Sequence, residues 1–315
     1  MTATRHSTIT AARVANRPFY SAFYWTLRDY AKRVWDNAGE DNALFLAGGI
    51  AFNLILAALP FLLLLLNGLS ALLPILYHGQ VDSTSAIREL IHNLLPAHSR
   101  GPDSPIDKMI NDLLATRRRV TIYSAIGFIW FSTRLFGSLR TVLASVFDIE
   151  SERGIIAGKI FDAKITVVST LLFVASVTLT TYLNLASHNT LINIGLATDV
   201  IKSVDYWIGR AFAFTFLVLM FFALYKYLPI RRVPAKAAWV AAAFASIAFE
   251  AARSAFSYYT TTFNPASLYS GTLAVIIIVI VWSYYAALLF ILGGEVGQVF
   301  ELRRVRKSQR EVLTD

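Results

Sequence analysis

The stretch ALFLAGGIAFNLILAALPFLLLLL, residues 43–66, contains no charged side chain. It lies within a longer charge-free run from Asn42 to Val81. A helix that crosses a bilayer needs about 20 mostly apolar residues, so this stretch predicts a membrane-spanning helix. Within it, Asn53 and a helix break at Pro60 would suit a broken helix that lines a polar cavity.

Five more apolar stretches follow the first. Together the six predict an all-α fold, a single bundle of six transmembrane helices within residues 43–302. Composition supports this class of protein, because only 16% of the 315 residues are charged, whereas soluble domains have about 25%. The expected spans are residues 43–66, 120–147, 165–186, 207–228, 236–259 and 271–292.

The segments outside the spans have distinct patterns. Residues 1–18 are polar and are expected to form a disordered cytoplasmic tail, and residues 303–315 a basic one. In residues 19–42, apolar and aromatic side chains recur every three or four positions, with basic residues mostly on the other side. This pattern predicts an amphipathic helix in the membrane interface; the alternative is a helix packed on the bundle. The long loop, residues 78–119, is expected to be a small helical cap outside the cytoplasm.

Lysine and arginine residues set the expected orientation. They are more frequent in the tails and short loops on the side of the N-terminus, which predicts that both termini are cytoplasmic. Arg117, Arg118 and Arg119 are an exception that this topology places outside. The net charge of +9 therefore reflects basic segments beside the spans and does not predict nucleic-acid binding.

Charged residues within or beside the spans are the main clue to function. A charged side chain inside a bilayer is costly unless it is paired or hydrated, so each one is a candidate functional residue. The predicted intramembrane polar site comprises Arg134, Arg140, Glu250, Arg253 and Glu295, with Asn53 from the first span.

Two readings of these charges remain open. Two cross-helix pairs are plausible, Arg134–Glu250 and Arg140–Glu295. At a rise of about 1.5 Å per residue, the first pair has a depth mismatch of about 10 Å, and Glu250 could instead pair with Arg253 on its own helix. The charges could be structural ion pairs. Alternatively, they could surround a cavity in which Arg134 anchors an anionic headgroup or solute, because the guanidinium fork suits phosphate and carboxylate.

Motifs for enzymatic chemistry are not found. The chain has no cysteine, and its five histidines lack metal-ligand spacing. The sequence GIIAGK at residues 154–159 is one residue short of a phosphate-binding loop and lacks the hydroxyl residue after lysine. We therefore expect no cofactor, no metal and no enzymatic activity.

Several short motifs together resemble a known family. They are AGGIAF at 47–52 with Pro60, the segment from Trp130 through Arg140 to Asp148, YKYLP at 225–229, YSG at 269–271, WSYY at 282–285 and GGE at 293–295. Over about residues 40–302 the chain is similar to the YihY/virulence factor BrkB family of bacterial inner-membrane proteins. The resemblance implies a six-helix protein of the bacterial cytoplasmic (inner) membrane with a transport or lipid-related role. The family's former label, ribonuclease BN, is not carried over, because the nuclease residues are missing.

The leading functional hypothesis is a permease-like transporter or lipid-handling protein. Its expected partners are membrane lipids, an anionic headgroup or solute, and a further protein if it works within a complex. The alternative is a non-transporting scaffold or accessory subunit, and a membrane nuclease is a third possibility. A transporter needs an open cavity around the buried charges, whereas a scaffold would hold them in direct, dry pairs.

Overall fold

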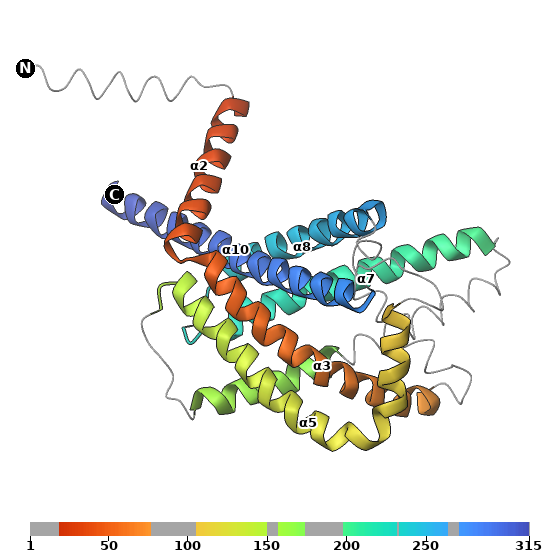
Figure 1. Cartoon of the computed structure of the whole chain (residues 1–315). Helices are drawn as coiled ribbons and strands as arrows, with labels where there is room; N and C mark the ends of the chain where they lie inside the picture. The colour runs from red at the N-terminus through yellow and green to blue at the C-terminus, as the bar shows by residue number, and fades with distance from the viewer. Residues whose placement is uncertain are drawn as a thin grey trace, which may run out of the picture.

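The computed structural model describes residues 19–76, 105–149, 157–173, 198–231, 233–263 and 271–314. Within these ranges the chain forms seven helices and no strand (Figure 1). They are α2 (Phe19–Glu40), α3 (Ala43–Leu76), α5 (Pro105–Val146), a helix over residues 157–173, α7 (Thr198–Tyr227), α8 (Ala235–Phe263) and α10 (Gly271–Thr314). The expected tail 1–18, most of the loop 78–119 and the end of the third span lie outside the described residues.

Four of the described helices are long and apolar enough to cross a membrane, which supports the prediction of an all-helical membrane protein. Two predicted spans, in α5 and in the helix over 157–173, are not among those four. The six-span count and the position of the termini therefore stay predictions. The four qualifying segments are Ala43–Phe61, Gly209–Tyr227, Ala235–Tyr259 and Ile276–Glu311.

Helix α3 differs from the broken helix that the sequence suggested. It continues through Pro60 without interruption. Asn53 donates a hydrogen bond from Nδ2 to the carbonyl oxygen of Gly49, at 3.0 Å, so its amide is used within its own helix. A Cβ added to Gly48 or Gly49 would meet no atom within 4 Å. The break at Pro60 is therefore a wrong prediction, because neighbouring turns keep the helix intact around the proline.

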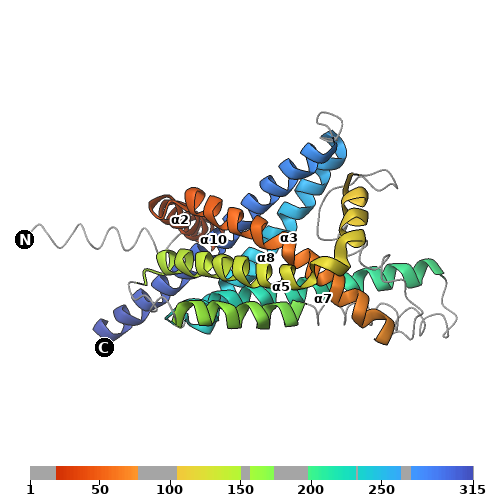
Figure 2. The same ribbon diagram turned by 60° about the horizontal axis from the view of Figure 1, so that its bottom comes forward.

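Helix α5 also corrects the expected boundaries. The end of the loop was expected to be helical and separate from the second span, but Pro105–Val146 is one continuous helix that includes both. Proline is favoured in the first turn of a helix, where its missing N–H has no partner to lose. The first turns of α5 stand at an angle to the rest of the helix (Figure 2). The main part of α5 packs along α3.

The centre of the bundle is formed by close packing of α8 on α10. The alanine-rich face of α8 is buried, as expected for an inner helix: Ala238, Ala241, Ala242 and Ala245 have no exposed surface. A Cβ added to Gly293 of α10 would lie 2.8 Å from the Ala245 Cβ. Small residues on both helices thus allow the two backbones to approach closely.

Helix α2 packs its C-terminal half against α10 (Figure 1). The Tyr30 hydroxyl donates a hydrogen bond to the Val296 carbonyl oxygen. Further along, Nδ2 of Asn37 donates to Oε1 of Gln298 at 2.9 Å. The alternative of a helix packed on the bundle therefore describes this half of α2.

Candidate functional site

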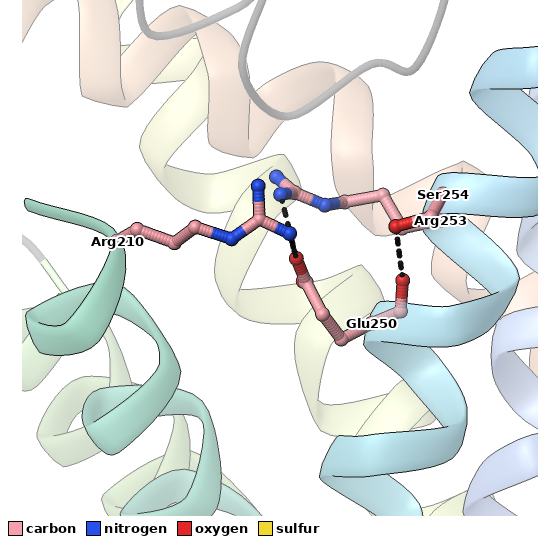
Figure 3. A network of polar contacts seen from close by, with 4 residues as sticks. All are labelled: Arg210, Glu250, Arg253 and Ser254. Atoms are coloured by element: carbon pink, nitrogen blue, oxygen red, sulfur yellow. Dashed lines mark hydrogen bonds and ion pairs between the residues drawn. The ribbon is translucent and has the colours of Figure 1, made fainter. Parts of the chain in front are cut away.

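The most connected charges lie between α7 and α8 (Figure 3). Oε1 of Glu250, on α8, accepts a hydrogen bond from Nη2 of Arg210, on α7, at 2.6 Å. The same oxygen accepts a second from Nη2 of Arg253 at 2.9 Å. We call these three residues the Glu250 cluster. It holds two guanidinium groups and one carboxylate, so its formal charge is +1.

The cluster is partly open. The side chains of Arg210, Glu250 and Arg253 are 39%, 26% and 37% exposed. Glu250 lies 15 residues from the start of α8, which corresponds to about 22 Å along the helix. Arg210 lies 17 residues before the end of α7, or about 26 Å. The short turn between these helices puts both residues at a similar depth, inside the two candidate spans.

Arg210 is the member of this cluster that sequence reasoning missed, because it was counted with an outer loop. The sequence nevertheless contained a signal for the contact between Arg210 and Glu250. Helices α7 and α8 are joined by a short turn near Pro229 and Pro234. In such a hairpin, residues at similar distances from the turn lie opposite each other, and this relation pairs Arg210 with Glu250. The alternative pairing of Glu250 with Arg253 was correct.

Arg134 does not belong to the cluster, and its predicted pair with Glu250 is wrong. Its side chain is exposed on α5, on the same face as Trp130, which is 60% exposed. Among the described residues it has no ion pair or hydrogen bond. The estimated depths of Arg134 and Glu250 already differed by about 10 Å, and α5 packs on α3 and α10.

Arg140 pairs with a different acid from the one predicted. Its Nη2 lies 3.3 Å from Oδ2 of Asp162, on the helix over 157–173. The two side chains are 17% and 3% exposed, so this is a largely buried ion pair. A Cβ added to Gly158 would lie 2.7 Å from Nη1 of Arg140, which means that glycine makes room for the guanidinium. Gly158 and Asp162, four residues apart on one helical face, were the missed sequence signal.

Glu295 is fully buried on α10, with 0% of its surface exposed. Neither carboxyl oxygen makes a hydrogen bond of normal geometry to a described residue. The side chains of Asn37 and Asp41 nevertheless lie close enough to interact with the carboxyl group, and Asp148 is near enough to act on it electrostatically. Its predicted pair with Arg140 is therefore wrong. The described residues contain no group of three acids, histidines or cysteines placed to hold a metal ion.

A polar network surrounds Glu295 and joins three helices. Gln298 receives the hydrogen bond from Asn37 and donates one from Nε2 to Oδ2 of Asp148, at 2.8 Å. Ser145 donates to Oδ1 of Asp41 at 3.2 Å. Asp148 has a positive φ of 49°, a conformation that Asp tolerates better than most residues. This network fixes the ends of α2 and α5 against α10.

Tyr30 contacts α10 beside this network, about two turns before Asn37 on α2. Burial raises the pKa of Tyr30 to about 12, although the nearby Arg303 guanidinium acts in the opposite direction. The Arg303 guanidinium carbon stands 4.9 Å from the centre of the Tyr30 ring. The hydroxyl therefore remains a hydrogen-bond donor at neutral pH, and the α2–α10 contact combines a hydrogen bond with a cation–π interaction.

Known proteins resemble this chain over most of its length. The sequence pattern of a family described as "Virulence factor BrkB" matches residues 34–313. The chain belongs to the virulence factor BrkB family. The match includes the Glu250 cluster, the Arg140–Asp162 pair and Glu295. No solved structure matches the chain.

Relatives in this family carry names that state a membrane location and no activity. The chain is 26% identical over 302 residues to a UPF0761 membrane protein of Alteromonas mediterranea, covering 94% of this chain and 97% of the relative. It is 27% identical to one of Cronobacter sakazakii, covering 90% and 92%. It is 28% identical to the UPF0761 membrane protein YihY of Escherichia coli, covering 96% and 97%.

Proposed function

We propose that this BrkB-family protein is a transporter or lipid-handling protein of the bacterial cytoplasmic membrane. The Glu250 cluster is the part of its polar site that binds an anionic group. The observation that carries the proposal is the excess positive charge at Glu250, where two guanidinium groups share one carboxylate within the candidate spans. In this proposal the protein is not an enzyme.

An excess positive charge inside a bilayer favours binding of an anion. Arginine is costly in hydrocarbon unless its charge is compensated, and Arg210 and Arg253 share the single carboxylate of Glu250. Both arginine side chains are more than a third exposed, so an anion can reach the cluster. A phosphate or carboxylate group that enters between α7 and α8 would complete the compensation through charge-assisted hydrogen bonds. Glu250 would hold both guanidinium groups in position for it.

The test compares two neutralising variants in reconstituted vesicles. The purified protein is placed in phosphatidylcholine liposomes that contain fluorescent phosphatidylglycerol, and movement of this lipid between leaflets is followed by chemical quenching. We expect Arg210→Gln to abolish most of the movement. Glu250→Gln, which frees both arginines, should strengthen retention of the lipid. Arg231→Gln, an exposed arginine in the turn after α7, is the charge-matched control and should behave as the wild type.

A scaffold function is the second candidate, and the direct pairing at 2.6 Å and 2.9 Å favours it. A purely structural cluster predicts a different pattern from the one above. Arg210→Gln and Glu250→Gln would then lower the unfolding temperature alike, and neither would change lipid movement. Equal losses of stability with unchanged lipid movement would refute the anion site.

The proposal includes six spans with both termini in the cytoplasm. Because the natural sequence has no cysteine, single cysteines report topology without background. Ser308→Cys, in α10, should be protected from a membrane-impermeant maleimide in intact cells, whereas Ser99→Cys, in the predicted outer loop, should be labelled. Labelling of Cys at position 308 in intact cells would contradict the orientation.

A further inference from the structure

A groove with a strongly basic lining lies between α2 and the C-terminal turns of α10. Its volume is about 360 Å³. Five basic residues and one acidic residue line it, so the formal charge of the lining is +4. We call it the basic groove, and it is lined by Asp29, Arg33, Arg303, Arg306, Lys307 and Arg310.

The basic groove has a defined shape because its two walls are fastened to each other. The Tyr30 hydroxyl and Asn37 bond to α10, as described above. Arg303 is held over the Tyr30 ring. The basic residues of α10 lie at positions 303, 306, 307 and 310, which is one face of a helix. Arg33 stands opposite them on α2, so the cations face a common space instead of spreading into solvent.

Three of the five cations that line the groove have no acidic partner among the described residues. Arg33, Arg303 and Arg306 form no ion pair with a described residue. Lys307 has only a long pair with Glu311, at 3.9 Å between two exposed side chains, and such surface pairs are weak. Like charges this close repel one another. A bound anion would relieve that repulsion and would receive several charge-assisted hydrogen bonds.

Position along α10 relates the groove to the membrane. The candidate span begins at Ile276, and Arg303 is 27 residues further on, about 40 Å along the helix. A hydrocarbon core is about 30 Å thick and a whole bilayer about 40–45 Å. Arg303 therefore lies about 10 Å beyond the hydrocarbon core, so the groove begins at the outer edge of the headgroup layer on that side, where anionic phosphate is abundant.

We propose that the basic groove binds a phosphate group, in addition to and independently of the intramembrane Glu250 cluster. Arginine is the preferred residue for this role, because its planar fork donates two parallel hydrogen bonds to phosphate. The phosphate could belong to an anionic lipid headgroup or to a soluble phosphate compound. Tyr30, Asn37 and Arg303 join the two walls of the groove, α2 and α10, so occupancy would also strengthen the attachment of α2 to the bundle.

The experiment measures binding to the full-length protein in neutral detergent. Short-chain phosphatidylglycerol is titrated and the bound fraction is read by native mass spectrometry. In a second arm, inorganic pyrophosphate competes with the lipid. Displacement by pyrophosphate indicates a site for any phosphate group, whereas lipid binding that resists pyrophosphate assigns the site to a headgroup held together with its acyl chains.

Two double variants separate the groove from general surface charge. Arg33→Gln with Arg306→Gln removes two groove cations and is expected to weaken lipid binding about 25-fold, at about fivefold for each charge. Arg231→Gln with Arg304→Gln removes two exposed cations outside the groove and should change affinity less than about twofold. Equal losses in the two double variants, or no binding to the wild type, would overturn the proposal.

A third variant tests the groove without removing any cation. Asp29→Asn deletes the acidic residue of the lining and is expected to tighten binding about fivefold. Asp29 is exposed and takes part in none of the α2–α10 hydrogen bonds described above, so folding should not change. An affinity that stays the same or falls in Asp29→Asn would also contradict the proposal.

Discussion

Glu250 and Glu295 lie on two helices that pack together, α8 and α10, yet they differ in exposure and in the charge of their neighbours. Glu250 is 26% exposed and shares one oxygen with two guanidinium groups. Glu295 is fully buried, has no hydrogen bond of normal geometry to its carboxyl oxygens among the described residues, and has two other acids nearby. The first centre is held together by charge, whereas the second is held by the packing and the hydrogen-bond network around it.

This difference separates sites suited to ligands from sites suited to structure. Partly exposed charges can exchange a protein partner for a ligand at little cost. Buried residues beside close-packed glycines cannot move without displacing a neighbouring helix. The two sites proposed to bind ligands, the Glu250 cluster and the basic groove, are of the first kind, whereas the Arg140–Asp162 pair and the α8–α10 contact are of the second.

The largest expected loss of stability is at the Arg140–Asp162 ion pair, the most buried pair among the described residues. Asp162→Ala leaves the Arg140 guanidinium buried without its partner and should lower the free energy of unfolding by about 3 kcal/mol. The double variant Arg140→Met with Asp162→Leu should recover most of this loss, since apolar residues of similar volume often replace a buried pair without cost. Unfolding temperature in detergent is the measurement. A double variant as unstable as the single one would contradict a charge-paired role.

The sequence predicted the helices better than the contacts between them. Apolar length alone identified the helices that contain Ala43, Trp207 and Gly271, because lipid requires about 20 apolar residues per crossing. The pairs of Arg134 and Arg140 were predicted wrongly, since depth along a helix does not define which face of the helix a residue occupies. Asp162 was overlooked because it lies in a polar segment before the expected start of its span.

The predicted intramembrane site was partly correct, because one of its contacts depends on local helix geometry and the others depend on how the helices are arranged. Glu250 and Arg253 are three residues apart on one helix, so their contact follows from local geometry alone. The contact with Arg210 depends on how α7 and α8 are arranged, which only the turn between them indicates. Asn53 bonds within its own helix, a common use of polar side chains in apolar helices that the sequence could not distinguish from a cavity-lining role.

The second effect tests packing at the Glu295 centre. In Gly293→Val the new Cβ would approach the Tyr225 hydroxyl and the Ala245 Cβ closer than side chains normally do. Helices α8 and α10 would have to separate, and we expect a loss of about 2–3 kcal/mol in unfolding free energy. Gly48→Val is the matched control, because a Cβ there would meet no atom within 4 Å. Equal losses in the two variants would show that close packing is not what holds this centre.

The smallest effect compares the two acids directly. Glu250→Gln leaves two guanidinium groups with a neutral acceptor and should lower stability by about 1 kcal/mol, a small value because the cluster is partly exposed. Glu295→Gln preserves shape and removes a carboxyl group that has neighbouring acids and no hydrogen bond of normal geometry, so stability should stay the same or rise. Glu295→Ala, which leaves a cavity, should instead cost about 2 kcal/mol. If Glu295→Gln were as destabilising as Glu295→Ala, the carboxyl group itself would have a favourable partner, and the contrast between a charge-held and a packing-held centre would be wrong.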